Sequence, residues 1–193
     1  MAPRGRSYQL YAAPVTILAH LIAITVTVLV LVWLLKFEGG FAFKSGNKLK
    51  IFNLHPFLMV VGLIIFGGEG TYAVFKFKDE TGTKDLVSLH TWLGIIAISA
   101  YGLQFVLGFF TFFFPGAAMP TRGSLLPWHT YFGTVIFLLA VCAAETGLIQ
   151  RFIGLGLALK LNQEGLIVNF TGLLIFLFGV SVTLSVILPR GSY

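Results

Sequence analysis

Five long apolar runs alternate with short polar segments along the whole chain. Each run reaches the ~20 residues with which an α-helix crosses about 30 Å of hydrocarbon. Inside lipid each must be helical, because no water is present to satisfy a free backbone. The pattern predicts an all-α membrane protein, a single-domain bundle (residues 1–193) of about five transmembrane helices. These helices are expected at about residues 15–36, 52–75, 88–114, 128–149 and 166–188.

The composition makes lipid the solvent of this chain. Hydrophobic residues make up 57% of the sequence, charged residues only 10%, and the mean hydropathy is +0.92. A soluble domain carries roughly 25% charged residues. The net charge of +6 is spread between the apolar runs, as for charges held at a membrane surface, so nucleic acid is not an expected partner. The single cysteine, Cys142, excludes a disulfide framework within one chain.

Five crossings would place the two chain ends on opposite faces of the membrane. The N-terminal face would then hold seven basic residues and the other face six, so the positive-inside rule gives no orientation. The seven are Arg4, Arg6, Lys76, Lys78, Lys84, Arg151 and Lys160, and the six are Lys36, Lys44, Lys48, Lys50, Arg122 and Arg190. The same alternation places His20 and His90 near the N-terminal face, and His55 and His129 near the other. Two imidazoles at each face are the minimum for two bis-histidine metal centres.

Two of the four histidines share one local pattern, His-Thr-aromatic-apolar-Gly. It reads "HTWLG" from His90 to Gly94 and "HTYFG" from His129 to Gly133. Positions i and i+4 share a helix face, so each glycine opens the wall beside its histidine. A flat porphyrin needs such space, and imidazole is a good axial ligand of haem iron. The pattern therefore favours haem ligation by both histidines over an interfacial role.

The other two histidines are weaker candidates. Gly62 follows His55 by seven residues, two turns along the same face, and spacing alone leaves ligation and an interfacial role equally open. His20 has Ile24 at i+4 and no glycine in its helix, which favours an interfacial residue. Two axial imidazoles leave iron no open position, so a centre of this kind would favour electron transfer over oxygen chemistry.

Several stretches resemble the cytochrome b-561 family, the ascorbate-dependent transmembrane di-haem proteins, and its plant members in particular. They are "FNLHPFLMVVGLIIFGGEG", "SLHTWLGI", "GSLLPWHTYFG" and "AAETGL", and the resemblance covers nearly the whole chain from about residue 30. It implies six helices, two b-type haems, and electron transfer from cytosolic ascorbate to monodehydroascorbate or a ferric chelate across the membrane. The expected location is the vacuolar membrane, another endomembrane or the plasma membrane.

The resemblance also assigns ligands. His55, His90 and His129 match the histidines of the family's second, fourth and fifth helices. The family pairs the second helix with the fourth and the third with the fifth. The third helix is missing here, with the break close to Gly70–Thr71. The resemblance therefore pairs His55 with His90 around one haem and leaves His129 without its partner.

The resemblance assigns two substrate residues as well. Lys78 stands where the family often has a histidine associated with the non-cytosolic substrate site. Arg122 matches an arginine that the family uses near cytosolic ascorbate.

Strict alternation conflicts with this pairing, because it puts His55 and His90 on opposite faces. The link "KFKDETGTKD" is charged and cannot easily recross hydrocarbon. Inversion of the downstream helices is therefore favoured over a link stretched through the bundle.

The sequence supports a b-haem membrane oxidoreductase acting between ascorbate and an acceptor in the lipid bilayer, with one or two haems. The rival is a shortened, haem-deficient isoform that serves as a non-catalytic membrane or dimerisation partner, and a homodimer is a further candidate assembly. A proton-coupled transporter is a weaker third hypothesis, because the sequence has neither inverted repeats nor broken helices.

Overall fold

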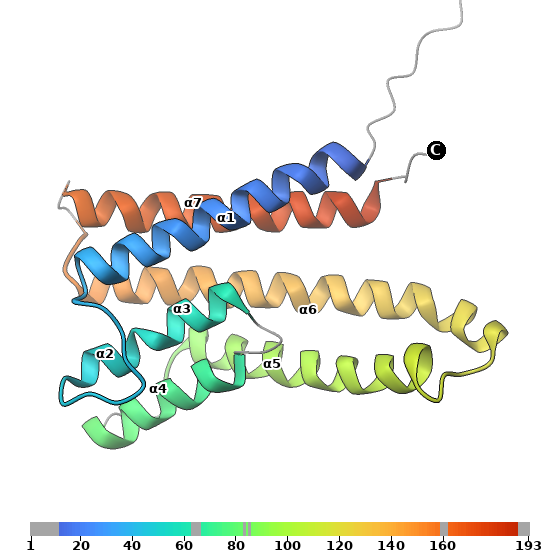
Figure 1. Cartoon of the computed structure of the whole chain (residues 1–193), viewed down its shortest axis with the longest axis horizontal. Helices are drawn as coiled ribbons and strands as arrows, with labels where there is room; N and C mark the ends of the chain where they lie inside the picture. The colour runs from blue at the N-terminus through green and yellow to red at the C-terminus, as the bar shows by residue number, and fades with distance from the viewer. Residues whose placement is uncertain (1–11, 63–66, 83, 85, 159–161, 189–193) are drawn as a thin grey trace, which may run out of the picture.

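The computed structural model describes residues 12–62, 67–82, 84, 86–158 and 162–188, and this part of the chain contains helices and no strand (Figure 1). The expected all-α membrane bundle is confirmed. Its elements are α1 (Ala12–Lys36), α2 (Lys48–Phe52), α3 (Leu54–Val61), α4 (Gly67–Thr81), α5 (Leu89–Gly108) with the π-helical turn η1 (Phe109–Phe113), α6 (Met119–Gly154) and α7 (Gln163–Ile187).

Four of the described helices are long and apolar enough to cross a membrane: α1, α5 with η1, α6 and α7. Much of their apolar surface faces outward. Ile17, Leu103 and Phe176, for example, are each more than half exposed. In water such a surface would be strongly unfavourable, whereas lipid tails are as apolar as the side chains that meet them.

The expected span at 52–75 is not one helix, and this expectation was wrong. Helix α3 ends at Gly62, whose backbone (φ −166°, ψ 90°) is not helical, and α4 begins at Gly67. The eight residues of α3 rise only about 12 Å, too little for a crossing. Glycine has low helix propensity, so Gly62 is a favourable place for α3 to end.

Helices α3 and α4 pack against each other as a hairpin that returns the chain to the end where it began (Figure 1). The buried side chains Leu54, Leu58 and Ala73 form a small core between them. The charged end of α4 stays at the surface, where Lys48 of α2 and Glu80 form an ion pair of 2.8 Å. The hydrogen bond from Lys48 holds the pKa of the Glu80 carboxyl below its usual range.

The hairpin changes the number of crossings from five to four. Helix α5 therefore starts at the end that carries α2, α3 and α4, here called the hairpin end. Ala12 and Ile187 lie together at the opposite end, here called the terminal end (Figure 1). The outermost described helical residues thus lie at the same end, whereas the expectation of chain ends on opposite faces had counted 52–75 as a crossing.

The new topology also redistributes the basic residues. Of those in the described ranges, eight belong to the hairpin end and one, Arg122, to the terminal end. The eight are Lys36, Lys44, Lys48, Lys50, Lys76, Lys78, Lys84 and Arg151. The remaining four, Arg4, Arg6, Lys160 and Arg190, lie outside the described residues. The even split of seven and six no longer holds, because Lys76, Lys78, Lys84 and Arg151 change end.

Two helix pairs build the bundle, α1 with α7 and α5 with α6, and α6 also packs against α7 (Figure 1). Helix α1 buries Ile22, Val26, Val30 and Leu34 at four-residue spacing, which places them on one face. This face meets α7 around Ile175 in the main hydrophobic core. The pairs thus hold α6 in the middle of the molecule, in contact with a helix on either side.

The four-crossing topology predicts that tags fused to the N-terminus and to the C-terminus lie on the same side of the membrane. An even number of crossings requires this whatever the absolute orientation. Protease protection of the two tags in sealed vesicles measures it. One protected and one cleaved tag would restore the five-crossing arrangement, and a variant with one added apolar span after residue 188 provides the control for opposite sides.

Candidate functional site

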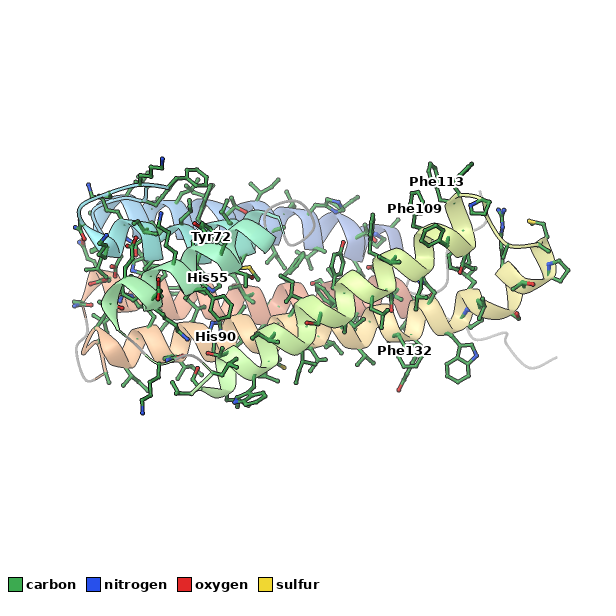
Figure 2. The ribbon with its side chains drawn as sticks, turned by 90° about the horizontal axis from the view of Figure 1, so that it is seen from below. His55, Tyr72, His90, Phe109, Phe113 and Phe132 are labelled. Carbon is green, nitrogen blue, oxygen red and sulfur yellow. The ribbon has the colours of Figure 1, made fainter. Side chains whose placement is uncertain are left out.

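The hairpin brings His55 of α3 and His90 of α5 together at one end of the bundle (Figure 2). Their ring centroids are 5.9 Å apart and the ring planes are inclined by 78°. Strict alternation and the inverted arrangement both placed these two residues on opposite faces, and both expectations were wrong. The pairing that the resemblance implied is the one present in the structure.

The orientation of His90 is fixed by a hydrogen bond to α6. Its Nδ1 lies 2.8 Å from the carbonyl oxygen of Ala143. A carbonyl can only accept, so Nδ1 carries the proton and donates, and in the neutral ring Nε2 keeps its lone pair. Histidines that bind metals are commonly held in this way, with one nitrogen donating to a carbonyl and the other free for the metal.

A glycine of the neighbouring helix makes room for this ring. A Cβ atom at Gly147 of α6 would lie only 2.8 Å from Cε1 of His90. The sequence pointed instead to glycines on the histidines' own helices. Nothing lies within 4 Å of a Cβ built at Gly94, so the wall of α5 is open there, and Gly62 ends α3. The haem-packing roles of Gly62 and Gly94 stay predictions.

His129 lies toward the other end of the bundle, on α6. Its ring meets Phe112 at a centroid distance of 5.1 Å, and a Cβ at Gly108 would lie 2.9 Å from its Cε1. A cavity of about 320 Å³ adjoins it. The cavity is lined by side chains of α5, α6 and α7, namely Gln104, His129, Thr130, Gly133, Thr134, Phe137, Val182, Thr183 and Val186.

Helices α5 and α6 repeat one contact at the two ends. Gln104 lies fourteen residues after His90 on α5, from 90 to 104. Its side-chain amide donates to the carbonyl of His129 at 2.9 Å. A Cβ atom at Gly133 would lie 2.7 Å from the amide nitrogen of Gln104. His129 and Gly133 in turn lie fourteen residues before Ala143 and Gly147, from 143 to 129 and from 147 to 133. Because α5 and α6 are antiparallel, a step of fourteen residues forward along α5 and fourteen backward along α6 keeps the same residues opposite each other. Gln104 therefore takes the position at the terminal end that His90 takes at the hairpin end.

Among the described residues, His55 and His90 are the only histidine pair with a ring contact. His20 is exposed on α1, and its Nδ1 lies 2.7 Å from the carbonyl oxygen of Thr16 in its own helix. His129 meets Phe112 rather than an imidazole. Two histidines still lie toward each end, but the grouping differs from the expected one, because His90 joins His55 at the hairpin end while His20 and His129 lie toward the terminal end.

The histidine pair suits a cofactor that needs two protein ligands. The described part of the chain holds no cluster of three or more His, Cys, Asp or Glu side chains, as a structural zinc site would require. Two imidazoles on opposite sides of one metal have centroids about 6 Å apart, taking a metal–nitrogen bond of about 2 Å as for zinc. The observed 5.9 Å agrees with this spacing. Haem iron, which takes four ligands from the porphyrin, fits this pair.

The two expected substrate residues lie at opposite ends of the molecule. Arg122 is in the first turns of α6, and its Nε donates to the carbonyl of Ala117 at 2.6 Å. Its guanidinium also packs against Gly116, whose φ of +79° suits glycine. Lys78 is in the last turn of α4 at the hairpin end. Their substrate roles stay predictions.

The sequence analysis missed Gly147, Gly108 and Gln104. Each matters through a contact between α5 and α6, and such contacts depend on the register of two helices. The small residue four positions after Ala143 was the available signal, since Ala143 and Gly147 share a face.

We expect Gly147→Ala to lower the thermal stability of the protein without cofactor. The added methyl group displaces the His90 ring and breaks its bond to Ala143, and overpacking of this kind costs about 1–3 kcal/mol. Gly154→Ala is the matched control on the same helix, because nothing lies within 4 Å of its Cβ position. Unfolding midpoints in detergent measure both, and equal midpoints would contradict the tight fit at Gly147.

The family model of eukaryotic cytochrome b561 matches residues 19–154. The ascorbate-specific transmembrane electron transporter 1 of Zea mays is 40% identical, over 96% of this chain and 93% of its own length. The transmembrane ascorbate ferrireductase 1 of Arabidopsis thaliana is 36% identical, over 92% of this chain and 88% of its own. The transmembrane ascorbate-dependent reductase CYB561 of Mus musculus is 32% identical, over 85% and 78%.

The alignment with the Zea mays protein is longer than the chain. It spans 221 positions against 193 residues, so at least 28 positions (221 minus 193) face a gap in this chain. About 20 residues make one crossing. The number of unmatched positions is therefore large enough for the absence of a whole helix, which stays a prediction.

Proposed function

Because the chain belongs to the eukaryotic cytochrome b561 family, we propose that it is an ascorbate-dependent oxidoreductase that moves electrons across the membrane through b-type haem. Relatives named for ascorbate-specific transmembrane electron transport and for ascorbate ferrireduction support the donor and the reaction. The observation that carries the proposal is the His55–His90 pair, with its centroid distance of 5.9 Å.

In this proposal His55 and His90 hold one haem, and each imidazole has a distinct support. His90 is fixed by its hydrogen bond to Ala143 and by the surface of Gly147, so its Nε2 is oriented before the cofactor arrives. His55 is held by the short helix α3. When bound, the haem would supply a one-electron couple, and His55 and His90 would leave its iron no open position. No side chain has to form a covalent bond with substrate.

We propose a single haem in this chain. His129 lies against Phe112 and Gly108, and in the described part of the chain no second imidazole faces it. Helix α5 with its 20 residues puts about 30 Å between the hairpin end and the terminal end. Electrons entering at the terminal end would cross most of this distance without a second bis-histidine centre. Transfer across the whole membrane is therefore expected to be slow in this chain.

The two basic side chains would attract the substrates. Ascorbate, the monodehydroascorbate radical and many ferric chelates are anions at neutral pH, and cationic side chains raise the local concentration of anions. We place ascorbate near Arg122 at the terminal end, and monodehydroascorbate or a ferric chelate near Lys78 at the hairpin end. The separation of the two residues by the length of the bundle supports one substrate at each face.

The family resemblance and the distribution of basic residues favour opposite orientations of the bundle in the membrane. The resemblance puts the Arg122 end in the cytosol, whereas eight described basic residues at the hairpin end favour that end by the positive-inside rule. We propose the orientation of the resemblance, because the donor ascorbate is cytosolic in it. The tags described above decide the matter, since this proposal requires both to be cytosolic.

Substitution of the ligands tests the haem site. We expect His55→Ala and His90→Ala each to lower haem content sharply, because a single imidazole holds the haem more weakly than two. His129→Ala and His20→Ala should retain wild-type haem content. The haem-to-protein ratio and the split visible bands of the dithionite-reduced protein measure this.

Two outcomes contradict the proposal. Loss of haem in His129→Ala equal to that in His55→Ala would support the inverted pairing instead. A folded wild-type protein that stays colourless after addition of haemin would support the non-catalytic, haem-deficient rival.

Substitution of the basic residues tests the substrate ends. We expect Lys78→Gln to slow reoxidation of the haem by a ferric chelate, and Arg122→Gln to slow further the already slow reduction of the haem by ascorbate from the terminal end, each by about tenfold at low salt. Stopped-flow absorbance in detergent measures both rates. Lys44→Gln, an exposed lysine at the hairpin end, is the control for Lys78. Equal effects of both variants on both half-reactions would show that the two residues do not serve separate substrates.

A further inference from the structure

Helix α6 carries three contacts on one face near the hairpin end. Ala143, Gly147 and Arg151 follow one another at four-residue spacing, which aligns them along the helix. The first two hold His90, through the 2.8 Å hydrogen bond and through the close surface of the glycine. The third, one turn further on, reaches the segment that carries His55.

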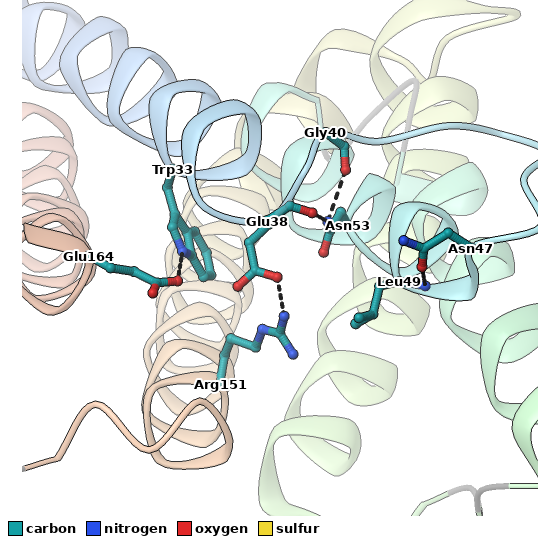
Figure 3. A network of polar contacts seen from close by, with 8 residues as sticks. All are labelled: Trp33, Glu38, Gly40, Asn47, Leu49, Asn53, Arg151 and Glu164. Carbon is teal, nitrogen blue, oxygen red and sulfur yellow. Dashed lines mark hydrogen bonds and ion pairs between the residues drawn. The ribbon is translucent and has the colours of Figure 1, made fainter.

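Arg151 contacts Glu38, which lies ahead of that segment (Figure 3), and Phe52 within it. Its guanidinium forms an ion pair with Glu38, which follows α1, and its Cζ lies 5.4 Å from the ring centroid of Phe52. The Glu38 side chain is only 6% exposed and that of Arg151 is 21% exposed. Phe52 is the last residue of α2 and lies three residues before His55.

Asn53 connects the same segment to the backbone around Glu38. This side chain is buried, at 1% exposure, and its Nδ2 donates to the carbonyls of Glu38 at 3.1 Å and Gly40 at 2.9 Å (Figure 3). Asn53 lies between α2 and α3, immediately before the turn of α3 that carries His55. The start of α3 is thus hydrogen-bonded to the backbone of Glu38 through Asn53, and the Glu38 side chain forms the ion pair with Arg151 of α6.

This ion pair is partly buried, with the Glu38 carboxylate as its more enclosed partner. Removal of Arg151 would leave that carboxylate largely buried and unpaired, which favours the arrangement that keeps the two together. The pair joins residue 38 to residue 151, on opposite sides of the α2–α4 segment in sequence. It can therefore set where that segment stands relative to α6.

We propose that Arg151 and Glu38 are positioning residues, which act through Phe52 and Asn53 to place His55 opposite His90. The face of α6 formed by Ala143, Gly147 and Arg151 then supports both imidazoles and sets the distance between them. This inference rests on the proposed function, because it concerns the haem ligands.

Binding of carbon monoxide to the ferrous protein provides the test. With both imidazoles in place the iron has no open position, so the wild type should not bind carbon monoxide. In Arg151→Gln and Glu38→Gln, displacement of His55 should open one position, and carbon monoxide should bind. Haem affinity should also fall by about 10- to 100-fold, as for other supports of metal ligands. Added imidazole should restore the bis-imidazole spectrum, which a general loss of packing would not allow.

Arg151→Gln and Glu38→Gln each leave one charge unpaired, which could disturb the fold by itself. Two further variants avoid this effect. Arg151→Lys retains the charge and should bind less carbon monoxide than Arg151→Gln. Phe52→Leu removes the aromatic contact and leaves the ion pair intact, and it should show the same change in a milder form. Lys36→Gln is the control, because Lys36 contacts Gln163 at 3.4 Å and the ring of Phe37 at 5.4 Å, and neither residue belongs to α2 or α3.

The outcomes separate this inference from the proposed function. If the haem-loaded wild type and all four variants alike exclude carbon monoxide and retain haem equally, Arg151 and Glu38 do not position His55. Variants that bind carbon monoxide but regain no bis-imidazole spectrum with imidazole would also overturn it, since the His90 side must then be lost. A wild type that takes up no haem overturns the proposed function, and this inference with it.

Discussion

The structure depends on the requirement that a chain inside lipid satisfy its own backbone over about 30 Å. The segment after α2 does not meet this requirement as one helix, because it is interrupted between Gly62 and Gly67. It turns back instead of crossing. Because this segment does not cross, α5 starts at the same end as α3, and His90 therefore lies beside His55. The His55–His90 pair thus forms because the α3–α4 segment turns back.

Helix α6 turns this topological consequence into a defined geometry. It lies between α5 and α7, and its last turns present a carbonyl, a glycine surface and a guanidinium along one face. The first two fix the ring of His90, and the third reaches the segment ahead of His55. The repeat of the glycine contact at Gln104 shows that the α5–α6 register is uniform along the pair. The histidine at the hairpin end is thus one case of a general packing pattern, in which a polar side chain rests on a glycine of the facing helix.

The sequence predicted those parts of the fold that depend on local composition. The apolar runs that became α1, α5, α6 and α7 were found because length and hydropathy are local properties. The run at 52–75 was also counted as a crossing, and Gly62 within it was taken as a position beside the haem rather than as the end of a helix. Once that crossing was miscounted, alternation placed His90 on the wrong face. The family resemblance gave the correct pairing because it compares whole chains. Gly147 and Gln104 stayed hidden, since their importance arises from the register between two helices.

The central claim is that two imidazoles from α3 and α5 face one another closely enough to hold one haem iron between them. Electron paramagnetic resonance of the frozen ferric protein tests this most directly, because the signal reports the axial ligands themselves. The account predicts a low-spin ferric signal of a bis-imidazole haem, at one haem per chain. A high-spin signal from iron with a single imidazole, in a protein that is otherwise folded, would contradict it.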